Sequence, residues 1–213
     1  YDTTSINRGQ VLIINNRYFG SFHKRFGSEV DIRCLKHLFE QMFMKVEIHQ
    51  DLDKSKMKEV IQQFAKFKIS DICLVIIMSH GEERKNELVV LDKANNGLKA
   101  SWIEEQFNNL NCTLFSGKPK VFLYQFCRGT QHFEDMLVGY ATQKGHRAHR
   151  DPNFGSWYIQ LICEVFMERA YNTHIVDMLN EVDRRLKLFS SSDTIQTSSY
   201  TSNGFNKNLY FNP

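Results

Sequence analysis

The chain has 213 residues, of which 42% are hydrophobic and 24% charged, and these fractions are typical of an ordinary globular protein. Lysine and arginine number 27 against 24 for aspartate and glutamate, so the net charge of +3 marks neither a nucleic-acid surface nor a polybasic membrane surface. The longest apolar run, residues 72–78, is far shorter than the ~18 residues of a membrane-spanning helix. We therefore expect one folded domain over residues 1–213, with no nucleic acid and no membrane among its partners.

Apolar runs alternate with segments of helical periodicity along the chain. In chain order, the predicted elements are a strand at 10–15, a helix at 28–43, a strand at 45–49, a helix at 55–67, a strand at 72–78, a hairpin piece at 88–91, a helix at 101–110, strands at 121–125 and 136–142, and helices at 156–170 and 173–189. Ser101 and Glu104 are predicted to form a capping box. A mobile polar loop from residue 190 to 203 and a final edge strand at 209–211 complete the prediction.

Strands separated by helices favour parallel pairing with right-handed crossovers. The predicted fold class is therefore α/β, a three-layer sandwich in which helices cover both faces of a central, mostly parallel sheet. In such sheets, reactive groups gather where the strands end at their carboxyl edge.

Two strand ends carry residues of catalytic type. The strand at 72–78 is followed by Ser79, His80 and Gly81, and the strand at 121–125 is followed by Phe126 and Cys127. A histidine close to a thiol can take its proton and later protonate a leaving amine, and the backbone N–H groups of Gly81 and Cys127 could bind an oxyanion. The alternatives are an inert buried cysteine and a histidine that merely satisfies a turn.

The local sequences at these positions are MSHGEE at residues 78–83 and QFCRG at residues 125–129. They resemble the histidine and cysteine motifs of the caspases, the cysteine proteases that cleave after aspartate. IINN at 13–16, SGKPKVF at 116–122, GSWYIQ at 155–160 and KNLYF at 207–211 follow in caspase order, so the resemblance covers nearly the whole chain. It implies caspase-type peptidase activity in apoptotic or related signalling, in the cytoplasm, with protein substrates and without a metal or other cofactor.

The resemblance also implies roles for individual residues. It makes Cys127 the nucleophile, His80 the general acid/base and Gly81 part of the oxyanion hole. Arg25, Gln125 and Arg150 would hold the substrate aspartate, because two guanidinium groups and an amide suit a carboxylate. The neighbouring residues Ala148, His149 and Trp157 would bind the rest of the peptide.

Three segments depart from the family pattern. Phe126 stands where a small alanine is usual, and its bulk either presses on the nucleophile or fills a gap. Residues 147–150 read RAHR, in place of aromatic residues and a serine, so Ala148 lacks a hydroxyl. Residues 198–205 are unusually polar for the strand that pairs across the caspase two-fold axis, which predicts weak homodimerisation or a different caspase partner. These departures favour the alternative function of a caspase-like regulator with little activity of its own.

Cysteine usage and chain length lead to two further expectations. The five cysteines, with no CxxC pair, predict free thiols in a reducing compartment; a zinc site formed by Cys127, His132, His146 and His149 is the less favoured alternative. Only residues 126–135 separate two predicted parallel strands, which is short for a crossover. Because caspases mature by cleavage at this point, we expect a large-subunit segment at 1–132, a small-subunit segment at 133–213, and a cleaved or missing linker between 130 and 134.

Overall fold

A six-stranded sheet forms the centre of the computed structural model, which describes residues 1, 3–19, 24–67, 70–85, 87–126, 135–143, 147–189 and 196–211. The strand order is β11-β8-β7-β3-β1-β2. The strands are β1 (Gly9–Asn15), β2 (Lys45–Gln50), β3 (Ile72–Met78), β7 (Lys120–Gln125), β8 (Met136–Tyr140) and β11 (Ser199–Asn203). All neighbours pair in parallel except β11, which runs antiparallel to β8 at one edge.

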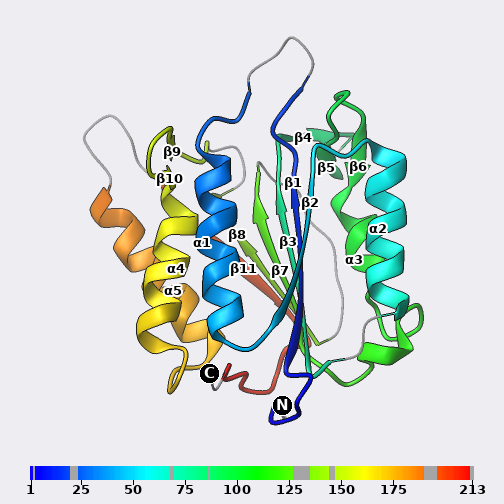
Figure 1. Cartoon of the computed structure of the whole chain (residues 1–213), viewed down its shortest axis with the longest axis vertical. Coiled ribbons are helices and arrows are strands. Elements are labelled where there is room, and N and C mark those ends of the chain that lie inside the picture. The colour runs from blue at the N-terminus through cyan, green and yellow to red at the C-terminus, as the bar shows by residue number, and fades with distance from the viewer. Residues whose placement is uncertain are drawn as a thin grey trace.

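Helices cover both faces of this sheet, which confirms the predicted three-layer fold (Figure 1). The helices α1 (Ser28–Gln41), α4 (Trp157–Arg169) and α5 (Ile175–Leu186) bury one face, and α2 (Lys54–Phe67) and α3 (Ala100–Glu105) lie over the other. Every residue of β1, β3, β7 and β8 is buried, as their continuous apolar sequences predict for parallel strands covered on two sides. Successive side chains alternate between the two cores.

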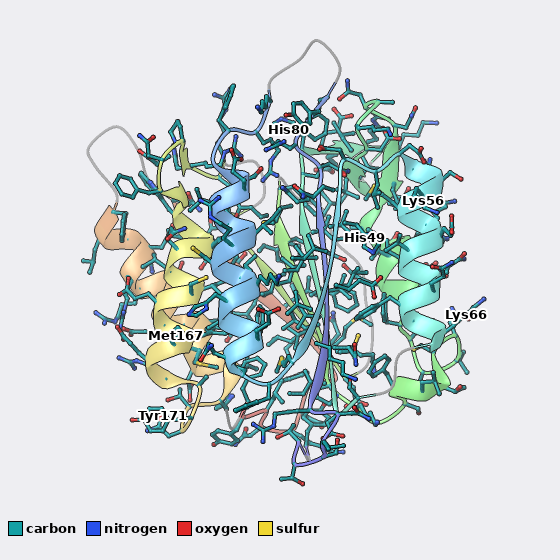
Figure 2. The ribbon with its side chains drawn as sticks, in the orientation of Figure 1. His49, Lys56, Lys66, His80, Met167 and Tyr171 are labelled. Carbon is teal, nitrogen blue, oxygen red and sulfur yellow. The ribbon has the colours of Figure 1, made fainter. Side chains whose placement is uncertain are left out.

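The register of the parallel strands brings the ends of β1, β3 and β7 into line. Asn15 pairs with Met78, and Met78 pairs with Gln125. The residues that follow these positions therefore leave the sheet side by side at its carboxyl edge. In Figure 2 this edge, marked by His80, lies at the opposite end of the molecule from Tyr171.

Two small sheets flank this edge. A three-stranded sheet contains β4 (Gly81–Arg84), β5 (Glu87–Leu91) and β6 (Gly97–Lys99), of which only the central strand was predicted, as a hairpin piece. β9 (Arg150–Asp151) pairs with β10 (Gly155–Ser156). Two short 3₁₀ helices, η1 (Thr113–Phe115) and η2 (Lys187–Phe189), complete the order of elements. The strand β4 begins immediately after His80 and fixes the chain beyond it.

The prediction for the third helix was wrong at both ends. α3 begins at Ala100, so Ser101 lies inside its first turn, and no side chain caps its first N–H groups. Glu104 is buried, and burial raises the pKa of its carboxyl to about 8. The helix ends at Glu105 because Asn108 favours a turn: its side-chain oxygen accepts hydrogen bonds from the backbone N–H groups of Leu110 and Asn111.

The expected final strand at 209–211 was also wrong, because those residues form no strand. The edge strand is β11, within the segment 198–205 that the family resemblance assigned to it and inside the range predicted as a polar loop. Leu209 and Phe211 are nevertheless buried in the α1/α4/α5 core. Their apolar pattern signalled burial, whereas the hydrogen-bonding edge of β8 was already taken by β11.

Within the described residues, no helix has both the length and the apolar composition needed to cross a bilayer.

Candidate active site

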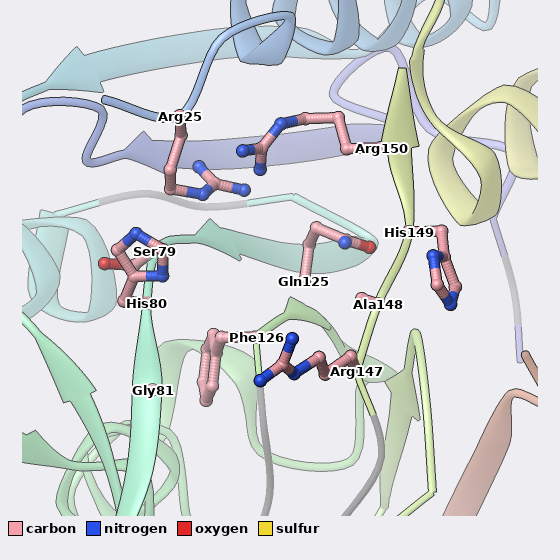
Figure 3. Close-up of a pocket in the computed structure, with 10 residues that line it drawn as sticks. All are labelled: Arg25, Ser79, His80, Gly81, Gln125, Phe126, Arg147, Ala148, His149 and Arg150. Carbon is pink, nitrogen blue, oxygen red and sulfur yellow. The ribbon is translucent and has the colours of Figure 1, made fainter. Parts of the chain in front are cut away.

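A pocket of about 500 Å³ opens at the carboxyl edge of the central sheet (Figure 3). Its lining residues are Arg25, Ser79, His80, Gly81, Gln125, Phe126, Arg147, Ala148, His149 and Arg150. They come from the segments that follow β1, β3, β7 and β8, as parallel strands ending at one edge require. The volume is in the usual range for ligand sites.

Most of the predicted site residues meet in this pocket. Those that line it are Arg25, His80, Gly81, Gln125, Ala148, His149 and Arg150. Trp157 lies beside it, with its ring stacked on that of His149. Cys127 lies outside the described residues, although the preceding Phe126 belongs to the pocket wall. The pocket therefore brings together segments that are far apart in the sequence. The described chain reaches Phe126, one residue before the proposed nucleophile.

Arg25 is held rigidly beneath the pocket. Its side chain is 1% exposed, and its guanidinium donates to Asn15 Oδ1 at 2.9 Å and to the backbone oxygen of Asn16 at 3.2 Å. These acceptors stand at the carboxyl end of β1. Burial and the nearby charge of Arg150 together lower the pKa of Arg25 to about 9, although the negative charge of Asp31 acts against this.

Arg150 brings a second guanidinium to the same place. Figure 3 shows the guanidinium groups of Arg25 and Arg150 pointing toward one another, with Gln125 beside them. The Arg150 Nε donates to the backbone oxygen of Phe26 at 2.5 Å. Burial lowers the pKa of Arg150, while Asp31 and Glu29 favour its charged form. Two cations brought together at a buried site favour the binding of an anion.

Gln125 adds an amide to this cluster. It is 3% exposed, and its Oε1 has no hydrogen-bond partner among the described residues. Gln125 occupies the last position of β7 and faces the same side of the sheet as Leu123. A buried amide with unused hydrogen-bonding capacity is suited to binding a polar ligand.

Asp31 ties the first helix to the segment that carries Arg150. Its two carboxylate oxygens accept hydrogen bonds from the Ser156 backbone N–H and hydroxyl, both at 2.8 Å. Burial raises the pKa of Asp31 to about 6, although Ser156 and the two arginines favour the ionised form. Because Ser156 pairs with Arg150 in the small β9–β10 sheet, this carboxylate helps fix the position of Arg150.

Gly155 should be sensitive to substitution because it lies against Asp31. We expect Gly155→Ala to lower the free energy of unfolding by about 3 kcal/mol, since its φ is +91° and an added Cβ would collide with the Asp31 carboxylate. Gly117→Ala is the matched control: its φ is +71°, but nothing lies within 4 Å of the added carbon, so backbone strain alone should cost about 1 kcal/mol. Urea denaturation measures both, and equal losses would contradict the clash.

His80 lies at the opposite side of the pocket from residues 147–150 (Figure 3). Its ring is half-buried and packs on the ring of Phe19 at a centroid distance of 4.5 Å. Its backbone oxygen accepts from the N–H of Leu91, while the Ser79 hydroxyl donates to the Leu91 oxygen at 2.6 Å. The imidazole is thus presented from a backbone anchored on both sides, and Gly81 pairs with Val90 directly after it.

Phe126 fills space on the α2/α3 side of the sheet. It is 3% exposed, and its ring lies 4.9 Å from that of Tyr124, which precedes it on the same face of β7. The ring also contributes to the pocket wall. This packing is that of a side chain that fills a gap; pressure on the nucleophile stays a prediction, because Cys127 lies outside the described residues.

The segment 147–150 is fixed by contacts that the sequence did not reveal. Gln196, which is fully buried, accepts from the His149 N–H at 2.7 Å and donates to the Ala141 oxygen at 2.8 Å. His149 projects to the other side of the segment from Arg150 in Figure 3, and its ring stacks on Trp157 at 4.9 Å. Trp157 also packs against Phe189, at 5.9 Å.

A zinc site gains no support within the described part of the chain, where no three His, Cys, Asp or Glu side chains gather closely enough to hold a metal. Cys127, His132 and His146 lie outside that part.

The sheet topology and the edge pocket together define a caspase-like α/β domain, and comparison with known proteins agrees. The family model described as "Caspase domain" matches residues 8–210, so the chain belongs to the caspase family. The crystal structure of the Drosophila initiator caspase Dronc superposes with a TM-score of 0.90 at 28% identity, covering 100% of this chain and 87% of that one.

Curated relatives give the same result. Caspase Dronc of Drosophila melanogaster is 25% identical over 97% of this chain and 56% of its own length. Caspase-2 of Gallus gallus is 29% identical over 88% of this chain and 53% of its own length. The chain thus spans a little over half the length of these two relatives.

Proposed function

We propose that this chain is the catalytic unit of a cysteine endopeptidase that cleaves peptide bonds after aspartate, in apoptotic or related signalling in the cytoplasm. The observation that carries the proposal is the pair of guanidinium groups of the buried Arg25 and the half-buried Arg150, next to Gln125, in the same pocket as His80. Bidentate, charge-assisted bonds to a carboxylate would satisfy this cluster. Family membership supports the cysteine-peptidase class.

The chemistry follows from the assigned roles. His80 accepts the proton of the Cys127 thiol, and the thiolate attacks the backbone carbonyl carbon of the substrate aspartate. The backbone N–H groups of Gly81 and Cys127 stabilise the oxyanion, and the protonated His80 returns its proton to the leaving amine. Water then releases the acyl group from sulfur. The arginine pair sets the position of the carbonyl, so that a longer glutamate side chain would displace it.

The pocket wall opposite His80 supplies the proposed binding sites for the substrate residues that precede the aspartate. Ala148 presents little side chain beside the aspartate pocket, and His149 stacked on Trp157 offers a flat ring surface. We infer that Trp157 binds the fourth substrate residue before the cut and that the polar segment 147–150 disfavours a small apolar residue next to the aspartate.

We further propose that the domain consists of a large segment, 1–132, and a small segment, 133–213, whose linker is cleaved or missing between residues 130 and 134. The parallel pairing of β7 with β8 supports this proposal. β8 begins with Met136 beside Lys120, the first residue of β7, whereas β7 ends with Gln125 at the opposite edge of the sheet. The intervening chain must return along the length of β7 with only ten positions, 126–135. Intact mass is the test: a single covalent species of 25.0 kDa would contradict the proposal.

β11 is the proposed contact with a second caspase, because it is the edge strand of the six-stranded sheet in the described part of the chain. Its sequence SYTSN is polar, which supports weak homodimerisation or a heterodimer over a tight homodimer. Inhibitor or adaptor proteins could use the same surface. Sedimentation of the purified protein over a range of concentrations distinguishes a weak dimer from a tight one.

A tetrapeptide library tests the proposed activity. Purified protein should cleave the members that end in aspartate, and an aspartyl electrophile should label Cys127. Absence of both cleavage and labelling would favour the alternative function, a caspase-like regulator that binds another caspase. Cys127→Ala separates the two functions further: the enzyme loses its biological effect, whereas the regulator retains it.

A further inference from the structure

Two cysteines outside the pocket face one another across the contact between α1 and α4. Cys34 and Cys163 are both free thiols and both partly exposed. The Cys163 thiol donates a hydrogen bond to the Cys34 sulfur, and the Gln160 amide approaches the same sulfur at 3.9 Å. Gln160 and Cys163 are one turn apart on α4, so both face the same point on α1.

The surrounding contacts hold these helices together. Asp31 lies one turn before Cys34 on α1 and binds Ser156 at the start of α4. The apolar residues Leu35 and Leu38 of α1 belong to the same core as Ile159 and Ile162 of α4. The packing of the two helices therefore holds Cys34 and Cys163 on facing sides of one contact, rather than at flexible ends.

The two thiols differ in acidity, and this difference decides which of them reacts first with an oxidant. The hydrogen bond from Cys163, assisted by Gln160, lowers the pKa of Cys34 to about 6 despite its partial burial. The same hydrogen bond, together with burial, raises the pKa of Cys163. Cys34 thus carries the thiolate that reacts with an oxidant, and Cys163 remains a protonated neighbour.

We propose that Cys34 and Cys163 form a peroxide-responsive thiol pair that oxidises to a disulfide between α1 and α4. The Cys34 thiolate attacks hydrogen peroxide: an S–O bond forms, the O–O bond breaks, and the released hydroxide takes a proton to become water. Oxidation removes the Cys34 thiolate whose hydrogen bond held the Cys163 proton. Cys163 then loses this proton, and its thiolate attacks the Cys34 sulfenic acid, forming the S–S bond as the S–O bond breaks. The oxygen leaves as a second water with the Cys163 proton. Two thiols are oxidised and one peroxide is reduced to two waters.

This disulfide has a consequence for the two-segment domain proposed above. Cys34 belongs to segment 1–132, and Cys163 belongs to segment 133–213. A bond between them would join the two segments covalently even after cleavage of the linker. It would also fix α1 to α4. Asp31 lies in the first turn of α1, and its hydrogen-bond partner Ser156 immediately precedes α4.

The test is native oxidation of the intact chain with hydrogen peroxide, followed by alkylation of the remaining thiols, tryptic digestion and mass spectrometry. We expect peptide 34–36 linked to peptide 151–169, with a mass two hydrogens below their sum, and loss of the link on reduction. The link is detected whether or not the protein is an active peptidase. Oxidation of Cys34 to sulfinic acid without the link, or its linkage to another cysteine, would overturn the proposal.

Single variants test the order of the steps. Cys163→Ser should accumulate a Cys34 sulfenic acid that dimedone traps, because the serine hydroxyl can still donate to the Cys34 sulfur. Cys34→Ser should leave Cys163 reduced. Cys73 and Cys112 are the internal control: they are 0% and 2% exposed, burial raises both pKa values, and neither should react in the native state. Equal oxidation of all four cysteines would contradict a selective site.

Discussion

Arg150→Gln should lower kcat/KM for peptides that end in aspartate by about 10²- to 10³-fold. Removing one charged partner of a desolvated ion pair costs several kcal/mol, and each 1.4 kcal/mol corresponds to tenfold. Arg150 is suitable for this test because its side chain is only half-buried, whereas Arg25 also supports Asn15 and Asn16 beneath the pocket. Steady-state kinetics on matched peptides ending in aspartate and asparagine measure the effect.

The comparison of the two peptides isolates the role of charge. The unmodified protein should discriminate strongly against asparagine, and Arg150→Gln should lose most of that discrimination because the asparagine peptide has no charge to lose. Arg33→Gln is the control, since Arg33 is exposed on α1 and does not line the pocket. An unchanged preference for aspartate in Arg150→Gln would contradict the assigned carboxylate pocket.

His80→Ala should reduce kcat by about 10²- to 10⁴-fold, the range that general acid–base catalysis contributes. The variant has no group to take the Cys127 proton or to protonate the leaving amine. It should also slow the alkylation of Cys127 by iodoacetamide, because the thiolate is the reactive form. Alkylation is measured by mass spectrometry and requires no peptidase turnover.

The histidine control is His37→Gln, which changes an exposed side chain on α1. It should leave both kcat and Cys127 alkylation unchanged. If Cys127 of the His80→Ala variant were alkylated at the normal rate while peptidase activity was lost, His80 would act only on the leaving group. Normal values of both rates would remove His80 from the mechanism.

The sequence predicted the architecture well because most core strands are continuous apolar runs. β3 illustrates this: each of its residues is buried, as expected for a parallel strand covered on both faces. The errors fell where local signals compete. Ser101 and Glu104 match a capping box, yet the register of α3 turns Glu104 into the core. Residues 209–211 look like a strand because burial and β pairing share the same apolar signature.

The sequence also predicted one part of the candidate site and missed another. Residues that follow strands were placed at one edge by topology alone, and motif resemblance selected Arg25 and Arg150 among many arginines. The supporting residues Asn15, Asp31, Phe19 and Gln196 were not predicted to bear on the site, because each acts through a side-chain or backbone partner that only the folded chain brings into contact. The only local signals were two asparagines ending an apolar strand and a carboxylate on the inner face of a helix.

The sequence by itself determined the parallel core strands and the main helices that alternate with them, the positions of His80 and Cys127 after strand ends, and the family resemblance. Those properties depend on short-range pattern and on motifs. Only the tertiary structure decided that Asp31 is a neighbouring counter-charge of Arg150, and that Cys34 lies beside Cys163. These contacts join residues more than a hundred positions apart, and they exist only because helix packing and strand register bring the segments together.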